Sequence, residues 1–187
     1  MRQRCAAVLM MFCLLLSSCG AAENGLQDAI AFRSALAARG CAFDCAISCA
    51  VGERNYVCKL ACAFAPDGEV QIEVLQPESI SGIKATMTSL TSVIEFDGIM
   101  LDFGSPHELL TSPLYAPLVC TLGWCDGYID CAGLDGDTMR VTYRIGYDED
   151  ELILESWSSG GVPIAFEIYA EEDMILSASV ENFTFLS

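Results

Sequence analysis

The fold is decided by an alternating stretch of the chain, CAFDCAISCAV at residues 41–51. Its odd-numbered positions are cysteines or larger apolar residues, and its even-numbered positions are small or polar. A period of two places the two sets on opposite faces of a β-strand, so the stretch predicts a strand with one buried face. A second alternating stretch at residues 56–64 follows a turn that contains Gly52. The two stretches therefore predict a β-hairpin of an antiparallel sheet.

Cysteines lie on one face of both predicted strands. If the turn is centred between residues 53 and 54, Cys49 faces Cys58 and Cys45 faces Cys62. Opposed residues of antiparallel strands have Cα atoms about 4.5 to 5.5 Å apart, within the range of a disulfide. We therefore predict cross-strand disulfides Cys49–Cys58 and Cys45–Cys62, or closely stacked thiols in a reducing compartment. The alternative is that these cysteines are small apolar core residues that stay reduced.

Further short strands follow along the chain, separated by turn signals such as Asp97-Gly98. The pattern predicts about eleven strands, at residues 41–51, 56–64, 69–75, 83–87, 92–96, 99–103, 125–132, 138–147, 151–157, 163–169 and 174–183. Sequential strands with short turns favour an antiparallel meander. The predicted fold class is mainly β (α+β), with a single strongly curved antiparallel sheet that forms an open half-barrel.

Two helical segments are expected to cover the concave face of this sheet. Residues 26–39 carry apolar residues at helical spacing, and Gly40 ends the predicted N-terminal helix. A central segment at residues 107–122 contains two prolines, which indicate an irregular or kinked helix that ends at Gly123.

The N-terminus carries a targeting signal. Arg2 and Arg4 precede an apolar run that leads to Leu16-Ser17-Ser18-Cys19-Gly20, and this pattern predicts a secretory signal peptide. The end of the run resembles the bacterial lipobox, which implies diacylation of the Cys19 thiol by palmitate-type acyl chains and cleavage before it. Two acyl chains give stable attachment to a bilayer. The alternatives are an ordinary signal peptide and a membrane-spanning helix, for which the run is too short.

The expected organisation is therefore a lipoprotein signal peptide at residues 1–18, a lipidated cysteine and tether at 19–25, and one domain at 26–187. The protein is expected outside the cytoplasm, anchored to the cell membrane through diacylglyceryl-Cys19. A short tether would keep the domain close to its membrane, as a docked protein and not as a shuttle.

Charge and composition narrow the classes of partner. The formal net charge is −17, and it becomes −19 once Arg2 and Arg4 are removed with the signal peptide. Such a charge argues against nucleic-acid binding and against adhesion to anionic lipid headgroups. Despite that charge, 53% of the residues are apolar. This content predicts a large core, an apolar ligand surface, or both.

The 11 cysteines leave an even number in the mature domain, because Cys5 and Cys13 lie in the signal peptide and Cys19 takes lipid. An even number outside the cytoplasm favours disulfides. Besides the four hairpin cysteines, the domain contains Cys41, Cys120, Cys125 and Cys131, whose pairing stays open.

Motifs of catalysis and of metal binding do not occur in the sequence. No pair has Cys-x-x-Cys spacing, and His107 is the single histidine, so neither a zinc site nor a thioredoxin-type activity is expected. A nucleophile elbow and a phosphate loop are also missing, and His107 is more typical of a surface or capping residue than of a general base. We expect no enzyme activity, no catalytic residue, no metal and no cofactor.

A family resemblance follows from four stretches and their order along the chain. They are Leu75-Gln76-Pro77-Glu78-Ser79-Ile80-Ser81-Gly82-Ile83, Val93-Ile94-Glu95-Phe96-Asp97-Gly98, Val141-Thr142-Tyr143, and residues 162–169 (VPIAFEIY) continuing to Val180-Glu181-Asn182-Phe183. Together they resemble the LolA/LolB-like superfamily of lipoprotein-sorting and lipid-binding proteins. Within it, the chain is most similar to lipid-anchored members from Gram-positive bacteria, such as those linked to spore germination.

The resemblance implies a half-barrel closed by helices, which holds acyl chains in an apolar cavity without a cofactor. The expected function is binding of a hydrophobic ligand or a lipidated partner protein, with Phe43, Ile47, Leu60 and Phe64 as candidate cavity residues. The alternative is a structural or partner-binding lipoprotein of the cell envelope, whose barrel is filled by its own side chains.

Overall fold

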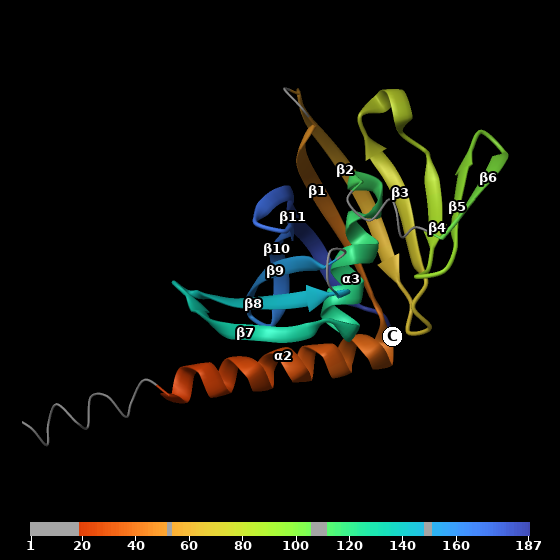
Figure 1. Ribbon diagram of the computed structural model, residues 1–187. Helices are drawn as coiled ribbons and strands as arrows, with labels where there is room; N and C mark the ends of the chain where they lie inside the picture. The colour runs from red at the N-terminus through yellow and green to blue at the C-terminus, as the bar shows by residue number, and fades with distance from the viewer. Residues whose placement is uncertain (1–18, 52–53, 106–111, 148–150) are drawn as a thin grey trace, which may run out of the picture.

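The computed structural model describes residues 19–51, 54–105, 112–147 and 151–187. Their strands form one open antiparallel sheet, which curves around a central helix (Figure 1). The eleven strands are β1 (Cys41–Val51), β2 (Arg54–Phe64), β3 (Val70–Gln76), β4 (Lys84–Met87), β5 (Ser92–Phe96), β6 (Ile99–Gly104), β7 (Tyr128–Asp135), β8 (Thr138–Ile145), β9 (Leu152–Ser159), β10 (Val162–Ala170) and β11 (Asp173–Phe185). The predicted fold class and the predicted number of strands are confirmed.

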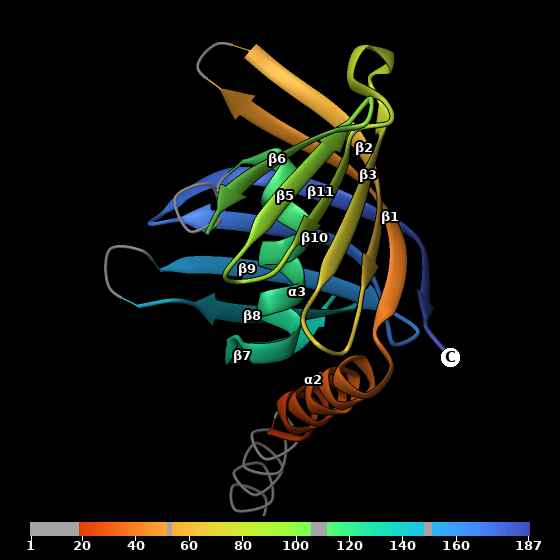
Figure 2. The ribbon, with the colours of Figure 1, turned by 90° about the vertical axis from the view of Figure 1, so that its right-hand side faces the viewer.

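The order of strands in the sheet explains where the central helix lies. The order is β6-β5-β4-β3-β2-β1-β11-β10-β9-β8-β7, so the first and last strands pair at the middle of the sheet. Strands β6 and β7 follow each other in sequence, yet they form opposite edges of the sheet. The chain between them therefore has to cross the sheet, and it crosses on the concave side, where α3 (Ala116–Asp126) lies inside the curve (Figure 2).

The alternation that predicted β1 is borne out by burial. Each odd position from Cys41 to Cys49 is buried, while the even positions between them are half-buried or exposed. The alternation in the sequence therefore corresponds to the buried and the outer face of this strand, as expected.

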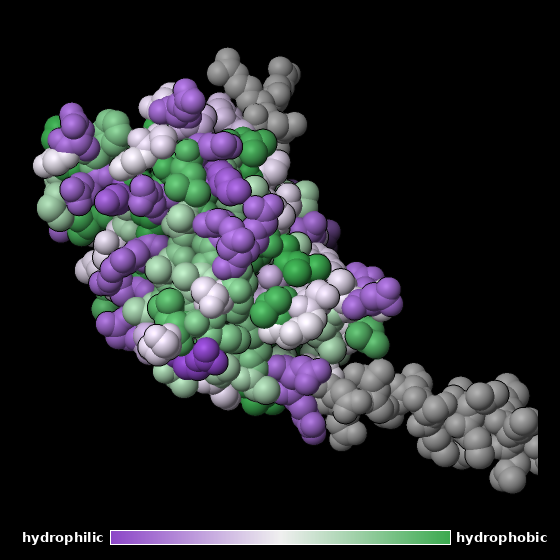
Figure 3. All heavy atoms as spheres, turned by 180° about the vertical axis from the view of Figure 1, so that it is seen from behind, coloured by the Kyte–Doolittle hydropathy of each residue, from purple (hydrophilic) through white to green (hydrophobic). Residues whose placement is uncertain are grey.

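The face of the molecule opposite to the view of Figure 1 mixes apolar residues with hydrophilic ones (Figure 3).

The N-terminal helix α2 (Cys19–Arg39) is longer than expected, because it begins at Cys19 and not at residue 26. The segment that was expected to be a tether is therefore helical, although its two glycines oppose the helix propensity of its two alanines. Gly40 ends the helix as predicted. Its N–H donates to the Leu36 carbonyl oxygen at 2.7 Å, and its φ of 68° is one that glycine adopts without strain.

The central segment differs from its prediction at its C-terminal end. A 3₁₀ turn, η3 (Pro113–Tyr115), leads into α3, which passes through Gly123 and ends at Gly127. Gly123 is there for packing: a Cβ atom at this position would lie 2.4 Å from Cδ2 of Leu154 on β9. As a result Cys125 belongs to the helix, and the strand expected at 125–132 starts at Tyr128.

The core is centred on Trp124 of α3, whose side chain is completely buried. Four phenylalanine rings surround its indole, at centroid distances of 5.6 Å for Phe32, 5.7 Å for Phe43, 6.2 Å for Phe183 and 6.5 Å for Phe166. These rings come from α2, β1, β10 and β11, so one tryptophan joins the N-terminal helix, the central helix and the middle of the sheet.

Two sequence predictions fall on residues outside the described ranges, namely the signal peptide at 1–18 and His107. Within the described part of the chain, no helix combines the length and the hydropathy needed to cross a bilayer.

Candidate functional site

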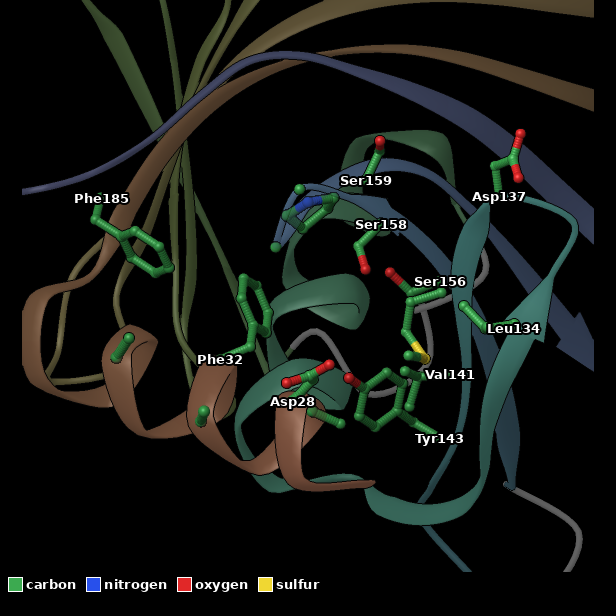
Figure 4. Close-up of a pocket in the computed structure, with 17 residues that line it drawn as sticks. Asp28, Phe32, Leu134, Asp137, Val141, Tyr143, Ser156, Ser158, Ser159 and Phe185 are labelled. Atoms are coloured by element: carbon green, nitrogen blue, oxygen red, sulfur yellow. The ribbon is translucent and has the colours of Figure 1, made fainter. Parts of the chain in front are cut away.

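A cavity of about 550 Å³ lies between helix α2 and strands β7 to β10, on the concave side of the sheet (Figure 4). This volume falls within the range of about 300 to 1,000 Å³ that is typical of small-molecule sites. The lining residues are Asp28, Ala29, Ala31, Phe32, Ala35, Leu134, Asp137, Met139, Val141, Tyr143, Ser156, Ser158, Ser159, Gly160, Gly161, Pro163 and Phe185.

The helical wall of the cavity is made by small residues of α2. Ala31 and Ala35 leave space where larger side chains would fill it, and Phe32 projects from the same helix into the cavity (Figure 4). Nearly two turns before Ala31 the helix approaches the sheet closely, because a Cβ atom at Gly25 would lie 3.0 Å from Sδ of Met139. A glycine followed by alanines thus holds the helix close to the sheet at one end and leaves space beyond it.

The sheet wall consists of the inward-facing positions of β8 and β9. Met139 and Val141 alternate along β8, opposite Ser158 and Ser156 of β9. Tyr143 comes next on the same face of β8. The sheet wall of the cavity is therefore mainly apolar on β8, apart from the Tyr143 hydroxyl, and carries serine hydroxyls on β9.

Two of the inward-facing residues are buried and carry hydroxyl groups. Ser156 is buried, and its Oγ accepts a hydrogen bond of 3.1 Å from Nε1 of Trp124. Tyr143 is 2% exposed, and burial raises the pKa of its phenol well above the usual value. Because both groups are neutral and lie in an apolar wall, they add hydrogen-bonding capacity without charge.

Charge at the cavity is acidic only. Asp28 of α2 and Asp137 of the turn between β7 and β8 are the charged residues among those that line it, and neither a lysine nor an arginine does so. Both aspartates are exposed, so they lie at the rim. The cavity therefore presents an apolar interior with an acidic rim.

Arg33 fixes the helix that forms one wall of the cavity. Its guanidinium donates to the carbonyl oxygens of Trp124 at 3.0 Å, of Gly123 at 3.5 Å, and of Gly127. These carbonyls lie at the C-terminal end of α3, where a cation is favoured by the helix dipole. The Gly123 oxygen also accepts the N–H of Gly127 at 3.1 Å, as in a capped helix end. The guanidinium also lies 5.8 Å from the centre of the Tyr143 ring. Arg33 thus joins α2 to α3 and to β8.

The cavity residues suggested from the sequence lie elsewhere. Phe43, Ile47, Leu60 and Phe64 are all buried in the core, and none of them lines the cavity. They occupy β1 and β2, in the part of the concave face that packs against the central segment; the Phe43 ring lies 5.7 Å from that of Trp124. The structure brings these four residues together as core and places the open space against β7 to β10.

The sequence did contain a signal for the true lining. Strand β9 continues an inward-facing series of Leu152 and Leu154 with Ser156 and Ser158. A change from leucine to serine on one face marks a place where the covering layer does not bury apolar side chains. Only the placement of α2, however, shows what lies above it.

The predicted register of the first hairpin is wrong by two residues. Pairing continues to Val51 opposite Arg54, so Cys45 faces Leu60 and Cys49 faces Tyr56. The strands pair closer to the turn than predicted, which adds paired residues at the end of the hairpin. The hairpin cysteines consequently lie on one face as diagonal neighbours and not directly opposite each other.

The hairpin thiols are close even in this register. Sγ of Cys45 lies 3.8 Å from Sγ of Cys62, and both residues are buried. All eight cysteines from Cys41 to Cys131 are free thiols in the structure. The predicted disulfides are therefore not formed here, and the pairing of Cys45 with Cys62 and of Cys49 with Cys58 remains a prediction.

Burial makes several of these thiols poor nucleophiles. It raises the pKa of Cys58 and of Cys125 to about 11, and that of Cys41 to about 12. The pKa of Cys120 is also raised well above its usual value, by burial and by the neighbouring thiols. Protonated thiols neither attack disulfides nor bind metals readily. Among the described residues no group of three or more histidine, cysteine or acidic side chains is placed to hold a metal ion.

Comparisons with known proteins give a likeness of fold only. No protein-family model matches the chain, and no curated protein matches it. A DUF1329 family protein from Desulfovibrio piger is similar in structure with a TM-score of 0.51 and 9% identity, over 88% of this chain and 92% of that one.

Two further solved structures are similar over most of the chain. A LolA superfamily protein from Nitrosomonas europaea has a TM-score of 0.49 and 9% identity, over 89% of this chain and 94% of its own. A putative outer membrane lipoprotein-sorting protein domain from Vibrio parahaemolyticus has a TM-score of 0.48 and 10% identity, over 88% and 93%. The lipid anchor and the Gram-positive type of this chain stay predictions.

Proposed function

We propose that the protein is a membrane-anchored, extracytoplasmic binding protein that holds a hydrophobic ligand, or an acyl chain of a lipidated partner, between α2 and β7 to β10. The observation that carries the proposal is the cavity of about 550 Å³ on the concave face. More than half of its lining residues are apolar, and the hydroxyl groups come from one tyrosine and three serines. Such a site suits an acyl chain better than a polar metabolite.

The driving force would be burial of apolar surface. Each Å² of apolar surface removed from water contributes about 25 cal/mol, so an acyl segment that loses about 200 Å² would gain about 5 kcal/mol before the costs of binding. Because the rim is acidic and lacks basic side chains, attraction to an anionic headgroup would add nothing. The chain of the ligand, and not its charge, would supply most of the affinity.

Anchoring is proposed at Cys19, which stands at the first position of α2. The helix runs unbroken from Cys19 to Asp28 at the cavity rim, a distance of about 14 Å at 1.5 Å per residue. An acylated Cys19 would therefore hold the cavity near the bilayer surface, from which an acyl chain would enter. Growth with a radiolabelled fatty acid should label the wild-type protein but not the Cys19→Ala variant, and a wild-type protein that takes up no label would contradict the anchor.

Ligand binding can be tested with the neutral fluorescent probe N-phenyl-1-naphthylamine, which brightens in apolar sites. We expect saturable brightening with the wild-type protein and its loss in Ala35→Trp, because Ala35 lines the cavity and an indole there would fill it. Ala38→Trp is the matched control, since Ala38 is exposed on the same helix and lies outside the cavity. A folded Ala35→Trp protein that binds the probe as the wild type does would contradict this site.

A second candidate function is supported by the filled part of the barrel. Around α3 the concave face is closed by the protein's own side chains, including Phe43, Ile47 and Trp124. If the whole barrel worked in this way, the protein would be a structural or partner-binding lipoprotein without a ligand. A folded wild-type protein that does not brighten the probe would favour this alternative.

A further inference from the structure

The polar groups inside the cavity indicate which class of amphiphile it takes, an inference that rests on the proposed ligand-binding function. The first of these groups is the hydroxyl of Tyr143. The residue is 2% exposed and lines the cavity, and its ring projects from β8 into that space (Figure 4). No hydrogen bond between the described residues involves this hydroxyl. Since the described residues contain no buried side-chain polar atom without a partner, this hydroxyl is accessible from the cavity, where a bound molecule can accept its hydrogen bond.

The second group is the hydroxyl of Ser156 on the neighbouring strand. Its oxygen accepts the N–H of Trp124, so its own proton is available for another partner. Ser156 pairs with Val141, and Tyr143 pairs with Leu154, which makes Tyr143 and Ser156 diagonal neighbours on one face. Diagonal neighbours have Cα atoms about 7 to 8 Å apart, so both hydroxyls can reach one acceptor atom between them.

The charges around the cavity decide what kind of acceptor this is. An anion buried beside two hydroxyls would need a cation, and no lysine or arginine lines the cavity. The nearest described guanidinium at Tyr143, that of Arg33 at 5.8 Å from the ring centre, already donates to three carbonyl oxygens at the end of α3. The aspartates at the rim, Asp28 and Asp137, would repel it as well. Tyr143 is a donor at neutral pH, as an ordinary tyrosine is, and burial raises its pKa further. The acceptor that fits is an uncharged carbonyl oxygen.

We propose that the cavity takes the acyl chain of a neutral ester, with the ester carbonyl oxygen bound by the hydroxyls of Tyr143 and Ser156. The chain then lies along the apolar wall formed by Phe32, Met139 and Val141. Free fatty acids, which are anions at neutral pH, are discriminated against. The site thus selects an esterified acyl chain, as in a monoacylglycerol or an acylated protein, over the free acid.

The proposal is tested by displacement of N-phenyl-1-naphthylamine at pH 7.5 with 1-monolauroylglycerol and with laurate, which share one chain length. We expect the ester to bind the wild-type protein at least tenfold more tightly than the acid. Tyr143→Phe should weaken binding of the ester about fivefold, the loss of one net hydrogen bond, after the ester affinity is corrected for the probe affinity measured separately for each variant.

Tyr115→Phe is the matched control for removal of a buried tyrosine hydroxyl. Tyr115 is also 2% exposed, but its hydroxyl is paired with Ser92 Oγ at 2.7 Å and lies outside the cavity. This variant should bind the ester as the wild type does. Laurate binding as tightly as the ester, or an unchanged ester affinity in Tyr143→Phe, would overturn the inference while leaving the proposed function intact. A wild-type protein that binds neither the probe nor the ester would instead overturn the proposed function.

Discussion

Replacement of Arg33 by methionine tests whether the cavity wall is held by hydrogen bonds to the end of α3. Methionine keeps an unbranched apolar stem and removes the guanidinium, which donates to the carbonyl oxygens of Trp124, Gly123 and Gly127. A hydrogen bond to a charged group contributes about 1.5 to 3 kcal/mol, and a cation at a helix C-terminus adds about 0.3 to 1 kcal/mol. Since Arg33 is half-buried, water can replace some of these contacts. We expect a loss of about 2 to 3 kcal/mol in the free energy of unfolding.

Urea and thermal unfolding measure this loss directly. For a domain of this size 1 kcal/mol corresponds to about 2 to 4 °C, so the Tm should fall by roughly 5 to 10 °C. Arg39→Met is the matched control, because exposed Arg39 donates a single hydrogen bond, to the Leu186 carbonyl oxygen, and lies over the Phe185 ring at 4.8 Å. It should cost less than about 1 kcal/mol. Equal losses for the two variants would refute the role assigned to Arg33.

Two further predictions concern the ends of the first hairpin and of α2. In urea unfolding, Gly40→Ala should destabilise the protein by at least about 2 kcal/mol more than the control Gly160→Ala. Both glycines have a left-handed φ, but only at Gly40, of these two, would a Cβ atom meet a main-chain oxygen, that of Phe64 at 2.2 Å. Oxidation by a thiol–disulfide oxidant should join Cys45 to Cys62, whose sulfurs are 3.8 Å apart, and stabilise the domain by about 3 kcal/mol. If peptide mapping without reductant finds both thiols free after oxidation, this prediction is wrong.

The sequence was sufficient for the strands because their signal is local. In β1 the alternation from Cys41 to Val51 states which face is buried, and no information from elsewhere in the chain is needed. Register is different, since it depends on where pairing stops at the turn. A turn placed one residue too late changed every partner in the first hairpin while keeping Cys45 and Cys62 on the same face. The prediction therefore had the correct face and the wrong partners.

Helix ends were harder to predict where a glycine serves packing. Gly40 and Gly123 look alike in sequence, because each follows an apolar helical segment. Only Gly40 adopts a positive φ and ends its helix, whereas Gly123 lies inside α3 and allows it to approach Leu154. The distinction depends on a contact with β9, about 30 residues away in the sequence, which no local pattern contains.

The location of the cavity follows from topology, and this is why alternation could not give it. Phe43 and Val141 are both buried on the concave face, and both are apolar residues at inward-facing strand positions in the sequence. They differ in which helix covers them. The link between the two edge strands carries α3 across the sheet and fills the space next to Phe43, whereas over Val141 the covering layer is α2 with its alanines.

The same arrangement ties the proposed ligand site to the proposed anchor. Helix α2 begins at Cys19, supplies Phe32 and Ala35 to the cavity, and is fixed to α3 by Arg33. Exposed lining residues lie on α2 at Asp28 and in the turns after β7 and β9 at Asp137 and Gly160, whereas the opposite side of the cavity is closed by the core around Trp124. We therefore expect an acyl chain to enter between α2 and these two turns. If so, Arg33→Met should loosen that wall and raise the rate at which N-phenyl-1-naphthylamine dissociates, while Arg39→Met leaves the rate unchanged. Stopped-flow measurement of the two variants distinguishes this entry route, since a route through another wall predicts equal rates.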